Sequence, residues 1–198
     1  MKSIMHRFVA ATLCLILPFS FAACAKTGGE APAATKKEAA TEKSAKAAGA
    51  GKRVYFAGPL FNQAEKDFNT KLAQVLEDAG YQVFLPQRDG IEAAQLEGKS
   101  EEALIKMIFE LDAGEVKKAD ILFMNLDGRV PDEGACVELG IAFASGKRCY
   151  GFKTDTRACE RSLDLNPMIS GCMTKIFNNL DGDKLIEEIK AYLAENEL

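Results

Sequence analysis

The chain has 198 residues, of which 27% are charged, and its formal net charge at pH 7 is −4. This mild acidity argues against a nucleic-acid polymer as a partner, because such partners require a basic surface. The one histidine, His6, lies in a predicted targeting segment, so we exclude serine–histidine triads and histidine metal sites from the rest of the chain. Acid–base or nucleophilic chemistry then falls to carboxylates, tyrosine or cysteine.

Residues 1–23 have the order of a secretory signal peptide. Basic residues precede an apolar run that ends at Phe21, and Ala22-Ala23 stand before Cys24. The run contains a proline and is shorter than the roughly 20 residues of a membrane span. Its ending resembles a bacterial lipobox, in which the cysteine is lipidated; Phe21 stands where leucine is usual, and an ordinary signal peptide is the alternative. We predict that Cys24 carries a lipid anchor to a membrane of the bacterial cell envelope, facing outside the cytoplasm.

The next segment is poor in large apolar residues. Residues 25–51 consist mainly of Ala, Lys, Glu, Thr and Gly, and such a composition buries too little surface to offset the entropy of ordering. We predict that residues 24–51 comprise the lipidated cysteine and a disordered tether. Residues 52–198 then form one domain, whose length is near the most common domain size.

Short apolar runs alternate with segments of helical periodicity in this domain. The predicted strands are Arg53–Ala57, Tyr81–Leu85, Ile121–Leu126, Arg148–Phe152 and Lys175–Phe177. Three of the predicted helices follow residues that can cap them, namely Asn62, Ser100 and Asp132. The last helix has Leu185, Ile186, Ile189 and Leu193 on one face. This alternation predicts an α/β fold with a doubly wound parallel sheet.

Polar residues follow the predicted strands, and right-handed crossovers bring the loops after parallel strands to one edge of the sheet. No glycine-rich dinucleotide or phosphate loop is present, so we predict no cofactor and no metal. A ligand with several hydroxyl groups suits this edge, because carboxylates accept hydrogen bonds from hydroxyls. The polar residues expected there are Tyr55, Gln87, Arg88, Asp89, Asn125, Asp127, Asp132 and Glu138.

The cysteines of the processed chain show no C-x-x-C spacing, which argues against a zinc site. Cys136 and Cys149 fall in predicted buried elements, where packing as small apolar side chains explains them. Cys159 and Cys172 flank a loop and could pair outside the cytoplasm.

Five segments of the domain share their order with a known family. They are Val54–Pro59, Leu85–Gly90, Asp112 before Ala119-Asp120, Pro131–Gly134 with Val137–Gly140, and Asn166–Ile169. From Arg53 to about Ile176, the chain thereby resembles the nucleoside 2-deoxyribosyltransferases. The resemblance implies a flavodoxin-like, three-layer fold and a homo-oligomer. It also implies that the N-glycosidic bond of a deoxynucleoside is cleaved and the sugar passes to another free nucleobase, or to water.

The resemblance assigns three catalytic residues. Glu138 matches the nucleophile, which attacks the anomeric carbon and forms a glycosyl-enzyme ester, as in retaining glycosidases. Tyr55 matches the tyrosine that hydrogen-bonds this carboxylate, and Asp112 matches an aspartate near the base that could protonate the leaving nitrogen. The alternatives are a solvated helix glutamate, a core aromatic side chain and a helix-end charge.

The resemblance also implies residues that bind the substrate. Asp132 would hold sugar hydroxyls, cap its helix, or do both. Asn166 would complete the site of a neighbouring subunit or serve only as a turn residue before a proline. Phe61 would stack on the base or simply pack. The residues expected to read the edge of the base are Gln87, Arg88 and Asp89.

Two other functions compete with deoxyribosyl transfer. The first is hydrolysis of a nucleoside monophosphate by an N-glycosidase, in which Arg88 or Arg129 would bind the phosphate. The second is a lipoprotein that binds nucleosides without catalysis. The joint presence of Glu138, Tyr55 and Asp132 favours an enzyme, because a binding protein needs no nucleophile.

Overall fold

The computed structural model describes residues 49–159 and 163–198. The predicted signal peptide, the lipidation at Cys24 and the tether up to residue 48 lie outside the described residues. In the part of the chain that is described, no helix combines the length and the apolar character that crossing a membrane requires.

Five strands form one parallel sheet in the order β2-β1-β3-β4-β5. All four neighbouring pairs of strands are parallel. The strands are β1 (Arg53–Ala57), β2 (Gln82–Phe84), β3 (Ile121–Asn125), β4 (Arg148–Lys153) and β5 (Lys175–Asn178). This sheet confirms the predicted doubly wound, flavodoxin-like α/β fold. Its strand order reverses between β1 and β3, which is where folds of this kind bind ligands.

Among the described residues, four long helices cover the sheet, and three short helices lie between strands. The long ones are α1 (Gln63–Asp78), α4 (Glu101–Lys118), α5 (Glu133–Ala144) and α7 (Gly182–Glu195). The side chains of Asn62, Ser100 and Asp132 accept backbone hydrogen bonds at the starts of α1, α4 and α5, as predicted. The short helices, which the sequence did not predict, are α2 (Pro86–Asp89), α3 (Ala93–Leu96) and α6 (Pro167–Cys172).

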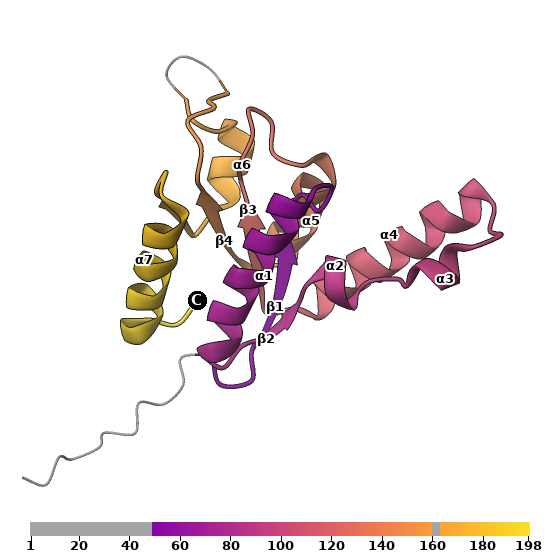
Figure 1. Ribbon diagram of the computed structural model, residues 1–198, viewed down its shortest axis with the longest axis horizontal. Coiled ribbons are helices and arrows are strands. Elements are labelled where there is room, and N and C mark those ends of the chain that lie inside the picture. The colour runs from indigo at the N-terminus through magenta and orange to yellow at the C-terminus, as the bar shows by residue number, and fades with distance from the viewer. Residues whose placement is uncertain (1–48, 160–162) are drawn as a thin grey trace, which may run out of the picture. The chain divides into compact units, whose positions relative to one another are not determined.

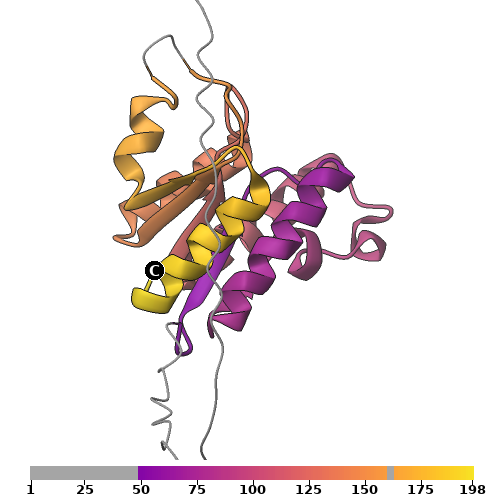
Figure 2. The same cartoon turned by 60° about the vertical axis from the view of Figure 1, so that its left-hand side comes forward.

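The two faces of the sheet carry separate cores. Helices α1 and α7 lie side by side on one face, and α4 and α5 cover the other (Figures 1 and 2). Alternate residues of β1 point to opposite faces, so Val54 and Phe56 join the first core while Tyr55 and Ala57 join the second. Burial on both faces explains why the strands read as continuous apolar runs. It also places Tyr55 on the side of α4 and α5.

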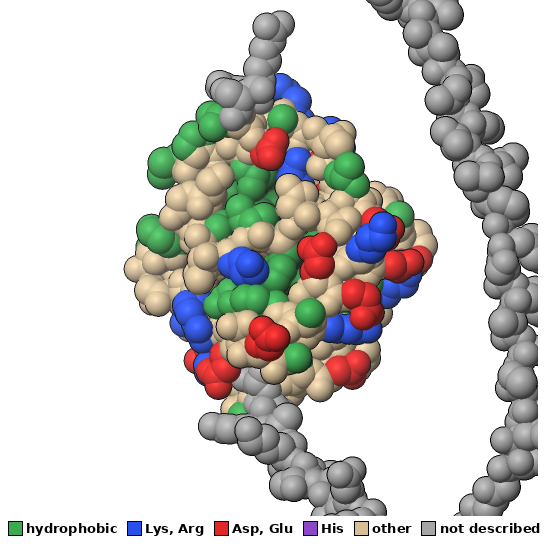
Figure 3. All heavy atoms as spheres, turned by 90° about the vertical axis from the view of Figure 1, so that its left-hand side faces the viewer, with side chains coloured by type: hydrophobic (Ala, Val, Ile, Leu, Met, Phe, Trp, Pro, Cys, Tyr) green, Lys and Arg blue, Asp and Glu red, His purple; other side chains and the backbone are tan. Residues whose placement is uncertain are grey.

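Figure 3 shows the face on the α7 side of the molecule. Basic and acidic side chains are interspersed there around a stripe of apolar side chains, rather than separated by sign. The part of this face that the structure describes therefore has no uniformly basic surface of the kind that binds a polyanion.

Candidate active site

A tyrosine on β1 and a glutamate on α5 form a hydrogen bond on the face of the sheet that α4 and α5 cover. Tyr55 on β1 is completely buried, and its hydroxyl donates a hydrogen bond of 2.7 Å to Oε1 of Glu138 on α5. Glu138 lies three residues after Ala135 and four before Ala142, both of which are buried. Because residues at this spacing share one face of a helix, Glu138 points toward the sheet rather than into solvent. Its interpretation as a solvated surface glutamate is therefore wrong.

Burial sets the ionisation of this pair. Burial, opposed by the hydrogen bond from Tyr55 and assisted by the charges of Asp112 and Asp132, raises the pKa of Glu138 from 4.5 to about 7. Burial, together with the charge of Glu138, raises the pKa of Tyr55 far above its usual range. The phenol thus stays protonated and can only donate to the carboxylate, whereas Glu138 changes its charge near neutral pH.

Asp112 on α4 is a second carboxyl side chain close to Tyr55 and Glu138. It is half-buried, and burial raises its pKa above the ordinary value, while the nearby Tyr55 hydroxyl opposes that shift. Asp112 and Glu138 line one groove of about 390 Å³ between α4 and α5. The other walls of the groove are largely apolar, and include Ile105, Ile108, Phe109, Val137 and Ile141. A carboxyl with a raised pKa beside a nucleophile is suited to carry a proton.

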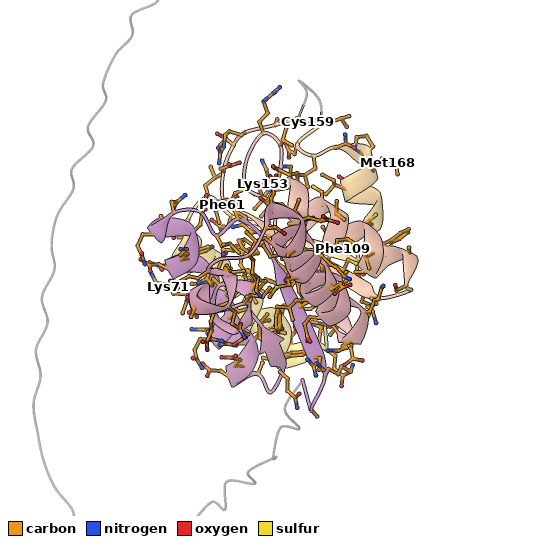
Figure 4. The ribbon with its side chains drawn as sticks, turned by 90° about the vertical axis from the view of Figure 1, so that its right-hand side faces the viewer. Phe61, Lys71, Phe109, Lys153, Cys159 and Met168 are labelled. Carbon is orange, nitrogen blue, oxygen red and sulfur yellow. The ribbon has the colours of Figure 1, made fainter. Side chains whose placement is uncertain are left out.

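A second, more polar pocket lies at the carboxyl end of the sheet. It has a volume of about 480 Å³ and includes Asp132, Asn125, Asp127 and Phe61 among its walls. Asp132 Oδ2 accepts a hydrogen bond of 2.9 Å from the backbone N–H of Ala135, so this residue both caps α5 and lines the pocket. Phe61 is 77% exposed and is not part of the core. Figure 4 labels both Phe61 and Phe109, and Phe109 on α4 lines the groove rather than this pocket.

The residues of α2 have other partners. The Gln87 amide nitrogen donates to the carbonyl of Lys66 and the hydroxyl of Thr70, at 2.8 and 3.0 Å. Arg88 forms ion pairs with Glu77 and Asp89, both at 2.9 Å. Asp89 also accepts from the backbone N–H of Leu85 at 2.9 Å. These contacts tie α2 to α1 and β2, and neither Gln87, Arg88 nor Asp89 lines the groove or the polar pocket. The structure therefore does not bring them to Glu138, because Pro86 starts a helix directly after β2.

Asn166 is not among the residues that line the groove with Glu138. It is exposed, and its side chain accepts a hydrogen bond of 2.9 Å from the backbone N–H of Met168 at the start of α6. It is therefore a helix cap rather than a simple turn residue, and it lines neither the groove nor the polar pocket. The proposed pairing of Cys159 with Cys172 is not formed, since both are free thiols. The Cys172 thiol instead donates to the carbonyl of Met168 at 3.2 Å.

Asp127 after β3 was expected at this edge, and the loop after β4 adds pocket residues that the sequence did not single out. Asp127 accepts hydrogen bonds from the backbone N–H and the hydroxyl of Thr154, each at 2.5 Å. In return, Asp155 accepts from the backbone N–H of Gly128 at 2.8 Å. Thr154 and Arg157 line the polar pocket together with Asp127. Thr154 and Arg157 could have been predicted from their positions just after β4, because folds of this kind bind ligands at the carboxyl ends of their strands.

The strand order and the buried Glu138–Tyr55 pair are those expected of a flavodoxin-like α/β enzyme of the deoxyribosyltransferase class. The chain belongs to the nucleoside 2-deoxyribosyltransferase family, whose sequence profile matches residues 54–182. No curated protein matches the chain.

Several solved structures share the fold. A 2-deoxyribosyltransferase from Bacillus psychrosaccharolyticus is 27% identical, with a TM-score of 0.56, and the match covers 74% of this chain and 98% of that one. A conserved protein from Enterococcus faecalis V583 is 26% identical, with a TM-score of 0.56 and coverage of 72% and 99%. A deoxyribosyltransferase from Leishmania mexicana is 22% identical, with a TM-score of 0.53 and coverage of 74% and 99%, and shows a shared fold.

Removing the hydroxyl of Tyr55 tests its contact with Glu138. We expect Tyr55→Phe to slow the chemical step by about ten- to a thousand-fold, the scale of losing one positioned hydrogen bond in a water-excluded site. Substrate binding should change less, because the ring keeps its buried position. Single-turnover kinetics measure the step directly, and Tyr150→Phe, which alters another buried tyrosine of the sheet, serves as the control. Equal rates in the wild type and Tyr55→Phe would show that Tyr55 only packs.

Proposed function

We propose that this protein transfers the 2-deoxyribosyl group between nucleobases, or hydrolyses it, through a glycosyl ester on Glu138. The observation that carries the proposal is the 2.7 Å hydrogen bond from the buried Tyr55 to Glu138, with Asp112 beside it. A buried carboxylate near other acids destabilises the folded state, and a protein that only binds nucleosides gains nothing from that arrangement. The geometry therefore favours an enzyme in which Glu138 is the nucleophile over a protein that binds nucleosides without catalysis.

The reaction would proceed in two balanced steps. Ionised Glu138 attacks the anomeric carbon and forms an ester as the C–N bond breaks, and the base leaves with the bonding electron pair. Asp112 holds a proton at the start of this step and gives it to the departing base. In the second step, another base or water attacks the same carbon, releases Glu138 and returns a proton to Asp112. Tyr55 orients the carboxylate throughout.

The charges of the polar pocket favour a nucleoside over a nucleoside monophosphate. Carboxylates of Glu65, Asp127, Asp132 and Glu133 line it, against one arginine, Arg157. A phosphate there would face net repulsion. Arg88, one of the two candidates for phosphate binding, is held by Glu77 and Asp89, and it lies outside this pocket. The other, Arg129, is exposed and also lies outside the pocket's walls.

We also propose that two or more copies share each site. Asn166 is exposed and does not line the groove that contains Glu138. The groove that contains Glu138 has large apolar side chains in solvent at its mouth, since Ile105 is 62%, Phe109 60% and Val137 58% exposed. Such a contiguous apolar surface marks an interaction site. A second copy that covers this surface could also supply Asn166.

The proposed location outside the cytoplasm rests on the lipobox-like ending at Cys24. We expect Cys24→Ser to abolish lipidation and to move the protein from the detergent phase to the aqueous phase in a phase-separation experiment. Cys136→Ser, which removes a thiol inside the folded domain, should leave partitioning unchanged. An unchanged detergent fraction for Cys24→Ser would mean that anchoring does not depend on this cysteine.

The activity itself can be tested in one experiment. Purified protein is incubated with 2′-deoxynucleosides, with and without a second free base, and the bases and nucleosides are separated by chromatography. Exchange of the base indicates transfer, and release of free base and sugar indicates hydrolysis. A 2-fluoro sugar analogue, which slows breakdown of the ester, should leave a covalent adduct on Glu138 in mass spectrometry. Absence of both turnover and adduct would contradict the proposal.

A further inference from the structure

Asn125 has an unusual combination of burial and an unused donor. It ends β3, next to the point where the strand order reverses, and is only 3% exposed. Its Oδ1 accepts a hydrogen bond of 2.9 Å from the backbone N–H of Asp127. This bond fixes the orientation of the amide. Among the described residues, the amide nitrogen of Asn125 has no hydrogen-bond acceptor. It is not a buried unpaired atom, so it is open to the polar pocket that the residue lines.

The neighbouring strand leaves room for this side chain. A Cβ atom on Gly58, directly after β1, would lie 2.7 Å from the Cβ of Asn125, which is closer than real side chains approach. Only glycine therefore allows the loop after β1 to pass Asn125 at this distance. This close approach holds the Cβ of Asn125 against the loop, while its amide group reaches the polar pocket that the residue lines.

The amide nitrogen of Asn125 is a hydrogen-bond donor in a pocket whose walls carry mainly acceptors. Glu65 already accepts from the backbone N–H groups of Phe61 and Asn62, at 2.9 and 3.2 Å. Asp127 accepts from Thr154, whose hydroxyl is thereby used as a donor. Asp132 has one oxygen in the cap of α5, which leaves its other oxygen for a ligand. A hydroxyl group needs both an acceptor for its hydrogen and a donor for its oxygen.

We propose that Asn125 is a specificity-determining residue that donates from its amide nitrogen to a deoxyribose hydroxyl oxygen, while Asp132 accepts the hydrogen of that hydroxyl. The inference rests on the proposed function, and it adds the group that distinguishes a hydroxylated sugar from one that lacks the hydroxyl. A site that pairs a substrate hydroxyl with buried polar groups rejects the analogue without it, because those groups are then left unpaired.

Exchanging the amide for a carboxylate isolates the donor. Asn125→Asp retains an oxygen for the Asp127 N–H and removes the N–H₂ group. Asn125→Ala removes the N–H₂ group without adding charge, but it also removes that oxygen. The probes are 2′-deoxyadenosine and thymidine with their 2′,3′-dideoxy and 2′,5′-dideoxy analogues. The dissociation constants are measured by calorimetry on full-length protein in a Glu138→Ala background, so that binding is read without turnover.

For the parent nucleosides we expect both Asn125 variants to bind about tenfold more weakly, the effect of one hydrogen bond of about 1.4 kcal/mol. For the analogue that lacks the contacted hydroxyl, the variants and the unchanged Asn125 protein should differ by less than about twofold. Asn69→Asp is the control, since this buried asparagine donates to Pro59 and Gln87 and lines neither the groove nor the polar pocket. Asn69→Asp should preserve the dependence on the hydroxyl.

An equal loss for the parent and both analogues would overturn the role of Asn125, since a merely structural residue weakens all ligands alike. Hydroxyl-dependent binding in a protein whose wild type has no turnover would support the Asn125 contact and contradict only the proposed catalysis. If no nucleoside binds at all, both proposals fail.

Discussion

Glu138→Gln should reduce base exchange by at least about a thousandfold, because an amide cannot form the glycosyl ester. The change is nearly isosteric, and the Gln oxygen can still accept the hydrogen bond from Tyr55. The fold should therefore survive. Steady-state kinetics and the covalent adduct with a 2-fluoro sugar are the two measurements, and both signals should disappear together. Glu110→Gln, which alters an exposed glutamate paired with Lys106 on α4, is the matched control.

The same variant should be more stable than the wild type at pH 8. The pKa of Glu138 is raised in the folded protein to about 7, above its ordinary value of 4.5. The protonated carboxyl therefore favours the folded state fully below pH 4.5, and this contribution is lost as the pH rises through 7. A carboxylate this far shifted would cost roughly 3 kcal/mol when ionised, and its partial exposure reduces this to about 2 kcal/mol.

Unfolding by urea at pH 5 and at pH 8 measures the difference. Glu138→Gln should gain stability over the wild type at pH 8 and lose most of that gain at pH 5, where the wild-type carboxyl is largely protonated. Wild-type turnover should rise with pH through about 7, since the nucleophile must be ionised. A variant that retains full exchange would refute the mechanism, whereas equal stability at both pH values would refute only the raised pKa.

The sequence predicted the parts of this site that local chemistry determines. The cap at Asp132 follows from residue type, and Ala135 and Ala142, which are buried on the same side of α5, show that Glu138 faces the sheet. The alternation of β1 likewise assigns Tyr55 to the face that α5 covers. Strand order and helix position then bring the two side chains within 2.7 Å. The resemblance to the family implied this contact, and the positions of β1 and α5 explain why it forms.

The residues of α2 are a part of the predicted site that the sequence could not place correctly. Gln87, Arg88 and Asp89 follow a strand that ends at the correct edge, yet their partners come from α1 and β2. The turn at Pro86 decides their direction, and no periodicity in the sequence encodes the direction of a four-residue helix. Similarly, the hydrogen bonds between Asp127 and Thr154 join two loops that are distant in sequence, so neither residue alone signals the contact.

Mixing two inactive variants should restore activity if the site is shared between copies. Glu138→Ala lacks the nucleophile, and Asn166→Ala lacks the residue that a neighbouring copy would supply. In a mixed dimer, one of the two sites combines an intact Glu138 from one chain with an intact Asn166 from the other. Random mixing of equal amounts makes half of the dimers mixed, so about a quarter of all sites are whole.

The expected result is therefore activity of about one quarter of the wild type after the two proteins are mixed and allowed to exchange subunits, against almost none for either variant alone. Activity per protomer of the wild type should also fall on dilution as the apolar surface around Phe109 becomes exposed to solvent. Phe109→Ser should weaken assembly and reduce activity without altering any residue that contacts Glu138 directly. Analytical ultracentrifugation measures assembly in the same samples. A fully active monomer, or mixtures that stay inactive after subunit exchange has been verified, would show that each protomer builds its site alone.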